Sequence, residues 1–270
     1  MSAEARTPSE VDAERRFGGL RRLYGDADYA RLRAGRFAVV GLGGVGSWAV
    51  EALARMGVAE LVLIDLDHVA ESNVNRQVQA LSSTLGMAKG EALRQRIADI
   101  HPDCKVRVIE EFVDEQNWPG LLEGQSIDGL IDACDQLRAK ACLAAWAMAA
   151  GLPFVGVGAA GGKRQPHAIE IEDLGLLTHD PLLASLRQRL RKQYGAARQG
   201  RMGVRCVFSR EAVLRPQDAA CGFEGESDGS LNCHGYGSSV AVTASFGMAA
   251  AAEMLKIFVG ASAKNLANKA

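Results

Sequence analysis

Short apolar runs alternate with amphipathic stretches through the first half of the chain. Five runs have the composition of buried strands, and most are followed by a glycine or an aspartate: 37–40, 61–64, 106–109, 129–131 and 154–157. Three stretches between them have helical periodicity: 47–56, 85–100 and 137–150. Strand patterns that alternate with helical ones indicate βαβ units. We therefore expect an α/β fold with a Rossmann-like, mostly parallel sheet and flanking helices.

Beyond Gly162 the alternation becomes less regular. Four segments still carry a clear pattern. The segments 168–171 and 204–209 predict strands, and the segments 181–194 and 240–258 predict helices. The last helix is rich in Ala, Val, Phe and Met, but Glu253 and Lys256 interrupt it. Because a membrane-spanning helix needs about 20 apolar residues, we expect a buried core or dimer helix and no membrane span.

These patterns predict one domain over residues 16–260. Its regular half covers about 36–160, and a smaller α+β extension covers about 161–260. The termini, 1–15 and 261–270, are expected to be flexible. Hydrophobic residues make up 48% of the 270 residues and charged residues 23%, as in ordinary soluble proteins. The charged N-terminal stretch has no apolar core and no signal-peptide character, so we expect a cytoplasmic location.

A glycine-rich turn follows the first predicted strand. Gly41, Gly43, Gly44 and Gly46 fit the pattern G-x-G-x-x-G between a strand and a helix. Such a turn lets a phosphate approach the backbone, and the N-terminus of the helix adds amide donors. Asp65 ends the next strand, where a carboxylate can bind ribose hydroxyls. The turn by itself also fits an NAD-dependent oxidoreductase.

The residues after Asp65 favour ATP over a dinucleotide. Arg76 and Lys89 follow closely, and two fixed cations can neutralise a triphosphate and stabilise departing pyrophosphate. Asp132 and Asp135 follow the fourth strand at the same carboxyl edge, where a carboxylate can hold Mg²⁺. We therefore expect an enzyme that uses ATP and Mg²⁺ to activate a carboxylate by attaching AMP to it.

The combined motif resembles the adenylating domain of the ubiquitin-activating superfamily, which includes bacterial enzymes that adenylate sulfur-carrier proteins. The resemblance implies that Asp65 holds ribose, that Asn73, Arg76 and Lys89 bind phosphates, and that Asp135 binds Mg²⁺. The nucleotide-binding set that it implies is Gly41, Gly43, Gly44, Gly46, Asp65, Asp67, Asn73, Asn75, Arg76, Gln77, Lys89 and Asp132.

The same resemblance implies a homodimer and an arginine near the N-terminus that enters the active site, often that of the partner subunit. Arg16 and Arg22 are the candidates here. With Arg76, Lys89 and Asp135 they complete the expected catalytic set.

A narrower group resembles the chain over about residues 16–260. The stretches that carry this resemblance are 16–25, 158–162, 180–183, 204–209 and the final helix. The group is the tRNA threonylcarbamoyladenosine dehydratases, ligase-type enzymes that use ATP to cyclise a side chain on the adenosine next to the anticodon. Attachment of AMP makes the carboxylate of that side chain a good acyl donor. A neighbouring group of the same side chain then displaces AMP.

A run of basic residues fits a tRNA substrate, although a solvated helix face would have the same composition. No acidic residue lies between Asp180 and Glu211, and such a cluster can follow a phosphate backbone. The net charge of −1 gives the whole molecule no strong field of its own. The expected tRNA contacts are Arg187, Arg189, Arg191, Lys192, Arg198, Arg201, Arg205 and Arg210.

Other readings stay open on the sequence alone. The chain could adenylate the C-terminal glycine of a ubiquitin-like sulfur carrier, with a cysteine desulfurase or sulfur acceptor as partner. It could also be a non-enzymatic nucleotide-binding scaffold. Cys233 precedes His234 and could form a thioester, but the cyclisation needs no such step. None of the six cysteines forms a C-x-x-C pair, so a zinc site of four thiolates has no support.

Overall fold

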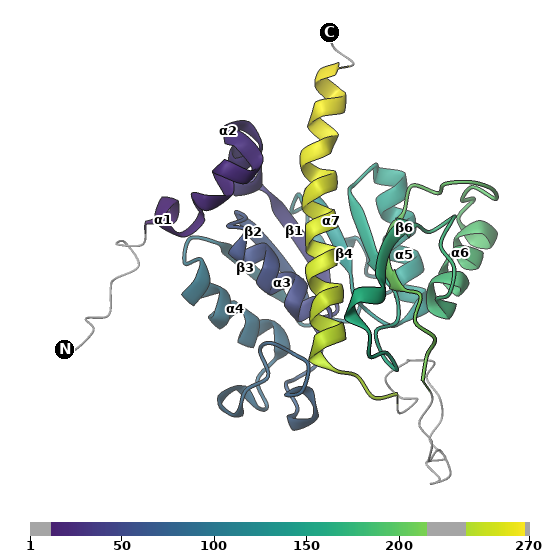
Figure 1. Ribbon diagram of the computed structural model, residues 1–270, viewed down its shortest axis with the longest axis horizontal. Coiled ribbons are helices and arrows are strands. Elements are labelled where there is room, and N and C mark those ends of the chain that lie inside the picture. Colours follow the sequence, from purple (N-terminus) through teal and green to yellow (C-terminus); the bar gives the residue numbers. More distant parts are fainter. Residues whose placement is uncertain (1–11, 215–235, 268–270) are drawn as a thin grey trace.

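A sheet of seven strands runs through the molecule in the order β3-β2-β1-β4-β5-β7-β6 (Figure 1). Neighbouring strands are parallel, except that β6 is antiparallel to β7. The computed structural model describes residues 12–214 and 236–267. The predicted fold class is confirmed. The strands are β1 (Arg36–Val40), β2 (Glu60–Ile64), β3 (Lys105–Ile109), β4 (Gly129–Asp132), β5 (Phe154–Val157), β6 (Ile169–Asp173) and β7 (Arg205–Ser209).

Helices cover both faces of this sheet. They are α1 (Ala13–Phe17), α2 (Gly19–Ala34), α3 (Gly46–Arg55), α4 (Lys89–Ile100), α5 (Leu137–Ala150), α6 (Pro181–Gln193) and α7 (Val240–Ala267). Short 3-10 turns lie in the connections: η2 (Glu71–Asn73), η3 (Ser82–Thr84), η4 (Gly120–Leu122) and η5 (Pro166–Ala168).

Alternate residues of each central strand enter two separate cores. In β1, Phe37 and Val39 pack with residues of α3, α4 and α7, whereas Ala38 and Val40 belong to the core beneath α5 and α6. Strands that are buried on both faces read as continuous apolar runs. This is why the sequence pattern located β1 and its neighbours to within about one residue.

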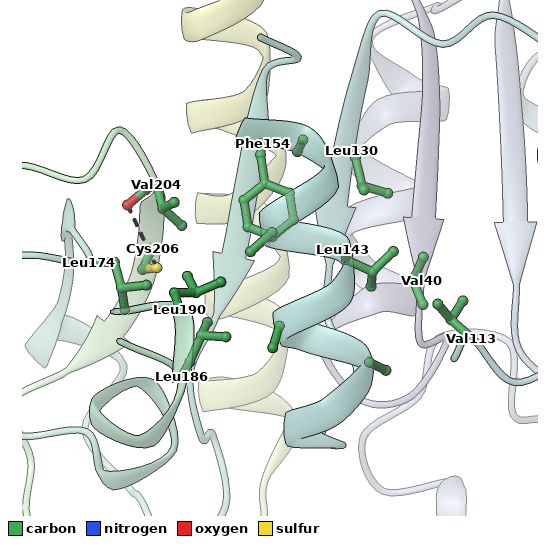
Figure 2. Packing of buried hydrophobic residues seen from close by; sticks show 14 of the residues in the cluster. Val40, Val113, Leu130, Leu143, Phe154, Leu174, Leu186, Leu190, Val204 and Cys206 are labelled. Carbon is green, nitrogen blue, oxygen red and sulfur yellow. Dashed lines mark hydrogen bonds between the residues drawn. The ribbon is translucent and has the colours of Figure 1, made fainter. Parts of the chain in front are cut away.

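The second core joins the sheet to α5 and α6 (Figure 2). Leu143 of α5 and Leu190 of α6 are fully buried there beside Phe154 of β5. Cys206 lies among them, with its Sγ 3.9 Å from the carbonyl oxygen of Val204. Burial raises the pKa of the Cys206 thiol, so it behaves as a packing residue.

The long helix α7 crosses one face of the sheet and packs most extensively on α3 (Figure 1). Its segment Val240–Gly260 is long and apolar enough to cross a membrane, but half of it is buried inside the molecule. Phe246 and Met254 are fully buried, so the apolar character is used for packing in the core. The helix continues to Ala267, beyond the end predicted near Phe258, because its alanine-rich continuation favours a helix.

The hydrophobic pattern predicts neither α1 nor α2. Asp12 caps α1, since its carboxylate accepts the backbone N–H of Arg15 at 3.1 Å. Phe17 is buried edge-on against His101, with the ring centroids 4.8 Å apart. In α2 the φ of 77° at Gly25 divides the helix into two pieces. Helices this short and polar carry too weak a periodicity to be read from the sequence.

The predicted start of α4 at Leu85 is wrong. Gly86 has a φ of 80°, so the chain turns there, and the helix begins at Lys89. This later start matters for the site, because it places Lys89 in the first turn of α4.

Candidate active site

The sheet offers one switch point, between β1 and β4. The connection from β1 leads to β2 on one side, while β4 lies on the other, so the chain diverges at the carboxyl ends of these strands. Ligands of open α/β sheets bind in the crevice that this divergence creates. A cavity of about 710 Å³ opens there, and residues from the loops after β1, β2, β3, β4 and β5 line it.

The glycine-rich turn after β1 forms the floor of this cavity. Gly41 has a φ of 84°, and a Cβ atom on it would lie 2.7 Å from the backbone nitrogen of Cys134. A Cβ atom on Gly46, which begins α3, would collide with the carbonyl oxygen of Gly41. The turn therefore needs glycine at both positions. Gly41, Gly43 and Gly44 line the cavity, whereas Gly46 is not among the lining residues and begins α3.

Asp65 is fixed at the carboxyl end of β2. Its Oδ2 accepts the backbone N–H of Leu42 at 2.5 Å, and its Oδ1 accepts the N–H of Asp67 at 2.8 Å. Burial raises the pKa of this carboxyl group, and the ammonium of Lys89 opposes that shift. The carboxylate thus braces the glycine turn while it faces the cavity.

Lys89 and Arg76 supply positive charge to the cavity wall. Lys89 lies 3.9 Å from Asp65 and 2.5 Å from Asp67, and its side chain is nearly buried. Arg76 donates from Nη1 to the carbonyl oxygen of Ser72 at 2.7 Å and to Oδ1 of Asn75 at 2.9 Å. Both cations line the cavity, as predicted from the sequence.

The loop that carries Arg76 is tied to α3 and to the segment just before α7. Trp48 of α3 donates from Nε1 to the carbonyl oxygen of Arg76 at 2.9 Å. Asn75 donates from Nδ2 to the carbonyl oxygen of Ser238 at 3.0 Å, so it orients Arg76 and lies outside the cavity lining. Asn73 and Gln77 do line the cavity.

The two aspartates at the carboxyl end of β4 lie in different environments. Asp135 lines the cavity. Asp132 is fully buried, and its Oδ2 lies 3.0 Å from Nζ of Lys140, which is equally buried. Asp132 is not among the residues that line the cavity, because Lys140 pairs with it in the core. Its contact with the nucleotide stays a prediction. A single lysine in an alanine-rich helix carries no sequence signal for this pairing.

The two N-terminal arginines lie outside the cavity of their own chain. Arg16 donates from Nη1 to the carbonyl oxygens of Asp99 at 2.9 Å and Ile100 at 2.6 Å. These carbonyls end α4 at the amino edge of the sheet, opposite the cavity, where a cation is favourable. Arg22 is exposed on α2. The entry of either residue into the site of a partner subunit stays a prediction.

The basic run is less uniformly exposed than its sequence suggests. Several of its members bind acidic side chains or backbone carbonyls of their own chain. Arg205 pairs with Glu253 at 2.7 Å, and Arg187 donates to the carbonyl oxygen of Leu177 at 2.7 Å. The other internal partners are Glu172 for Arg201, Glu170 for Arg210, Gln193 for Arg189 and the carbonyl of Ala197 for Arg191. Lys192 and Arg198 are exposed.

The sequence does not predict a further part of the cavity lining. It is formed by the loop 158–161 after β5, by Leu182 at the start of α6, and by Tyr236. Asp180 caps α6 by accepting the N–H of Leu183 at 2.9 Å, and its other oxygen accepts the N–H of Ala159 at 2.9 Å. The sequence Asp-Pro before a helical pattern is the signal that could have located this cap.

Two cysteines bear on the site. Cys233 and His234 lie outside the described residues. Cys134 lines the cavity, and burial, followed by the neighbouring Asp132 carboxylate, raises the pKa of its thiol well above the usual range. Such a thiol is a poor nucleophile at neutral pH.

The sequence profile of the ThiF family matches residues 17–270. The chain belongs to the ThiF family. Within this ThiF-family chain, the matched span contains every residue that lines the cavity.

Named relatives cover nearly the whole chain. The tRNA threonylcarbamoyladenosine dehydratase of Escherichia coli is 40% identical over 92% of this chain and 95% of its own length. The enzyme of the same name from Haemophilus influenzae is 39% identical over 90% of this chain and 92% of its own. The solved structure of the Escherichia coli enzyme in complex with ATP has a TM-score of 0.84 at 39% identity, over 94% of this chain and 98% of that one.

A relative with a different acceptor matches only in part. The molybdopterin-synthase adenylyltransferase of Salmonella typhimurium is 34% identical over 124 residues, which are 46% of this chain and 49% of its own. The shared length is close to that of the regular α/β half.

Proposed function

We propose that the chain is an ATP-dependent dehydratase that adenylates the carboxylate of threonylcarbamoyladenosine in tRNA and drives its cyclisation. The observation that carries the proposal is the cavity at the switch point. It brings a phosphate-binding glycine turn, two cations and several carboxylates together with the loop 158–161, Leu182 and Tyr236. Relatives named for this activity match along nearly their entire length, and that supports the same acceptor.

The nucleotide end of the cavity accounts for the first chemical step. Asp65 accepts the ribose hydroxyls, and the amides of the glycine turn hold phosphate oxygens at the N-terminus of α3. An oxygen of the substrate carboxylate attacks the α-phosphorus, and pyrophosphate leaves. Arg76 and Lys89 stabilise the charge on the phosphates during that departure. The product is an acyl adenylate.

The second step needs no protein nucleophile. A neighbouring group of the same side chain attacks the activated carbonyl carbon, and AMP leaves with the electron pair of the broken C–O bond. The ring closes, and the proton of the attacking group is lost to solvent or to a nearby base. The oxygen removed from the substrate departs in AMP, which makes the reaction a dehydration at the expense of ATP.

Mg²⁺ fits the donor set of this cavity. No group of three or more His, Cys, Asp or Glu able to hold a metal occurs in the described part of the chain. Mg²⁺ in phosphate-transfer sites is typically held by one or two carboxylates together with phosphate oxygens. Asp135 is such a carboxylate and lines the cavity. Bound there, Mg²⁺ would neutralise phosphate charge.

The cavity lining that lies outside the nucleotide motifs suits the acceptor. The loop 158–161, Leu182 and Tyr236 offer an apolar and aromatic surface beside backbone amides. An enzyme that modifies a base must take that base out of its stack and hold it in a pocket of this kind. Asp180 keeps the loop and the first turn of α6 together, so this wall of the pocket is pre-formed.

The exposed cations of the basic run extend this surface. Lys192 lies about 15 Å along α6 from Leu182, at ~1.5 Å per helical residue. Lys192 and Arg198 are the members that we propose to contact tRNA phosphates. We also propose a cytoplasmic homodimer. The apolar helix α7 exposes Met248, which offers an apolar contact to a partner subunit.

The discriminating experiment offers ATP with two acceptors. The purified protein is incubated with Mg²⁺, ATP and either tRNA that carries threonylcarbamoyladenosine or a carrier protein with a C-terminal glycine. AMP release is then measured for each acceptor. We expect AMP release with the modified tRNA only, together with a tRNA nucleoside lighter by one water. Release with the carrier protein alone would instead establish the sulfur-carrier adenylyltransferase, the alternative to which the partial match with an adenylyltransferase points.

A further inference from the structure

A wholly buried ammonium group lies directly beneath the nucleotide cavity. Lys140 of α5 has no solvent exposure, and its Nζ contacts oxygen atoms of residues 132–134. The distances are 3.0 Å to Oδ2 of Asp132, 2.9 Å to the carbonyl oxygen of Cys134 and 3.5 Å to the carbonyl oxygen of Asp132. One cation thus gathers three oxygens of a single short loop.

That loop forms part of the cavity wall. Its residues Ala133 and Cys134 pack against Gly41 so closely that a Cβ atom on Gly41 would meet their backbone atoms at 2.7–2.8 Å. The next residue is Asp135, which lines the cavity. Any movement of the loop would therefore shift both the glycine turn and the acidic residue.

Lys140 and Asp132 form an ion pair in the protein interior. Burial lowers the pKa of Lys140, but the carboxylate of Asp132 raises it, and the net direction is upward. Oδ1 of Asp132 is also occupied, because it accepts the backbone N–H of Cys134 at 3.2 Å and lies 2.9 Å from its Sγ. Buried ion pairs of this kind are seldom more stabilising than apolar residues of the same volume. Stability alone therefore gives little reason for its presence.

We propose that Lys140 is a positioning residue of the nucleotide site, which fixes the 132–135 loop so that Asp135 faces the metal–phosphate position while Asp132 is held in the core. The inference rests on the proposed use of the cavity for ATP and is independent of the acceptor. Lys140 acts through backbone carbonyls and a carboxylate and touches no substrate.

Three variants test this role. Lys140→Met removes the charge at similar side-chain length and leaves Asp132 buried without a partner. The double variant Asp132→Asn/Lys140→Met removes both charges. No uncompensated charge is then left in the core, but the contacts of Lys140 with the carbonyl oxygens of the loop are still missing. Arg138→Met is the matched control, because it removes an exposed cation from the same helix.

The measurement is the dissociation constant of ATP by calorimetry, with Mg²⁺ and with EDTA, beside the unfolding temperature of each variant. Loss of a residue that supports a metal ligand typically costs about 10–100-fold in affinity. We expect a loss of this size with Mg²⁺ in both Lys140 variants and a much smaller one with EDTA. The double variant should regain most of the unfolding temperature that Lys140→Met loses.

A merely structural role predicts a different pattern. Affinity would then follow the unfolding temperature, and the double variant would bind Mg²⁺–ATP as the parent does, which would overturn the proposal. If Lys140→Met does not fold, the double variant and the control carry the test by themselves. Failure of the parent to bind ATP would instead overturn the proposed function, and the inference with it.

Discussion

The ammonium of Lys89 lies 2.5 Å from a carboxylate oxygen of Asp67, at the edge of the cavity. Asp67 is more than half exposed, whereas the Lys89 side chain is 7% exposed. A phosphate that enters the cavity can therefore replace Asp67 as the partner of Lys89 without burying the released carboxylate. The pair keeps the cation oriented before the nucleotide arrives.

This relationship leads to the first prediction. Lys89→Met should weaken ATP binding by at least about tenfold, since a charge-assisted contact to a phosphate contributes about 1.5–3 kcal/mol. Asp67→Asn is the matched control. It removes the competing carboxylate, so ATP affinity should be equal to that of the parent or higher. Calorimetric titration with ATP measures both, and a loss of the same size in the two variants would contradict the exchange of partners.

The second prediction separates the two aspartates that follow β4. Asp135→Asn should lower kcat by about 10²–10³ and leave the unfolding temperature unchanged, because a preorganised electrostatic contact is lost at an accessible position. Asp132→Asn should lower the free energy of unfolding by about 3–5 kcal/mol, since it leaves the buried ammonium of Lys140 without its counter-charge. Thermal unfolding and steady-state kinetics on both proteins check this. Equal effects on stability would contradict the assignment.

The third prediction concerns pH and Asp65. Burial raises the pKa of this carboxyl in the folded chain above its ordinary value of about 4. A raised carboxyl pKa contributes stability that is complete below the unfolded value and is lost as pH rises through the folded value. Asp65→Asn, which does not titrate, should therefore gain in unfolding temperature over the parent as pH rises from 4 to 7. A difference between the two proteins that does not change with pH would disprove the raised pKa.

Much of this site was readable from the sequence because its residues directly follow buried strands. Gly41 and Asp65 end apolar runs that only a parallel sheet satisfies, so the edge that they share follows from topology. The position of Asp132 could not be read in this way. Its partner Lys140 is eight residues further on in an alanine-rich helix, and only the packing of that helix under the loop brings the two charges together.

The basic run also shows that tertiary partners of charged residues cannot be predicted from the sequence. In sequence it has no acidic neighbour, but the antiparallel pairing of β6 with β7 brings Glu172 beside Arg205, and α7 brings Glu253 to the same guanidinium. Charge balance in a folded chain is set by tertiary neighbours. A run of charges along the sequence therefore overstates the charge that is available to a partner.

The last prediction tests which members of that run contact tRNA. Lys192 and Arg198 are exposed, so the double variant Lys192→Glu/Arg198→Glu should weaken tRNA binding and leave ATP affinity unchanged. Phosphate contacts release counterions, and the logarithm of the affinity falls with the logarithm of the salt concentration by about 0.7–0.9 per contact. The slope of the double variant should be shallower than that of the parent by roughly two such contacts.

Arg205→Met is the control, because Arg205 is paired with Glu253 at 2.7 Å. It should lower the unfolding temperature and leave the slope unchanged. Filter binding across a salt series measures all three proteins. Parallel lines for the parent and the double variant would mean that this face is only solvated, and a shallower slope for Arg205→Met would mean that the internal pair opens to meet the tRNA.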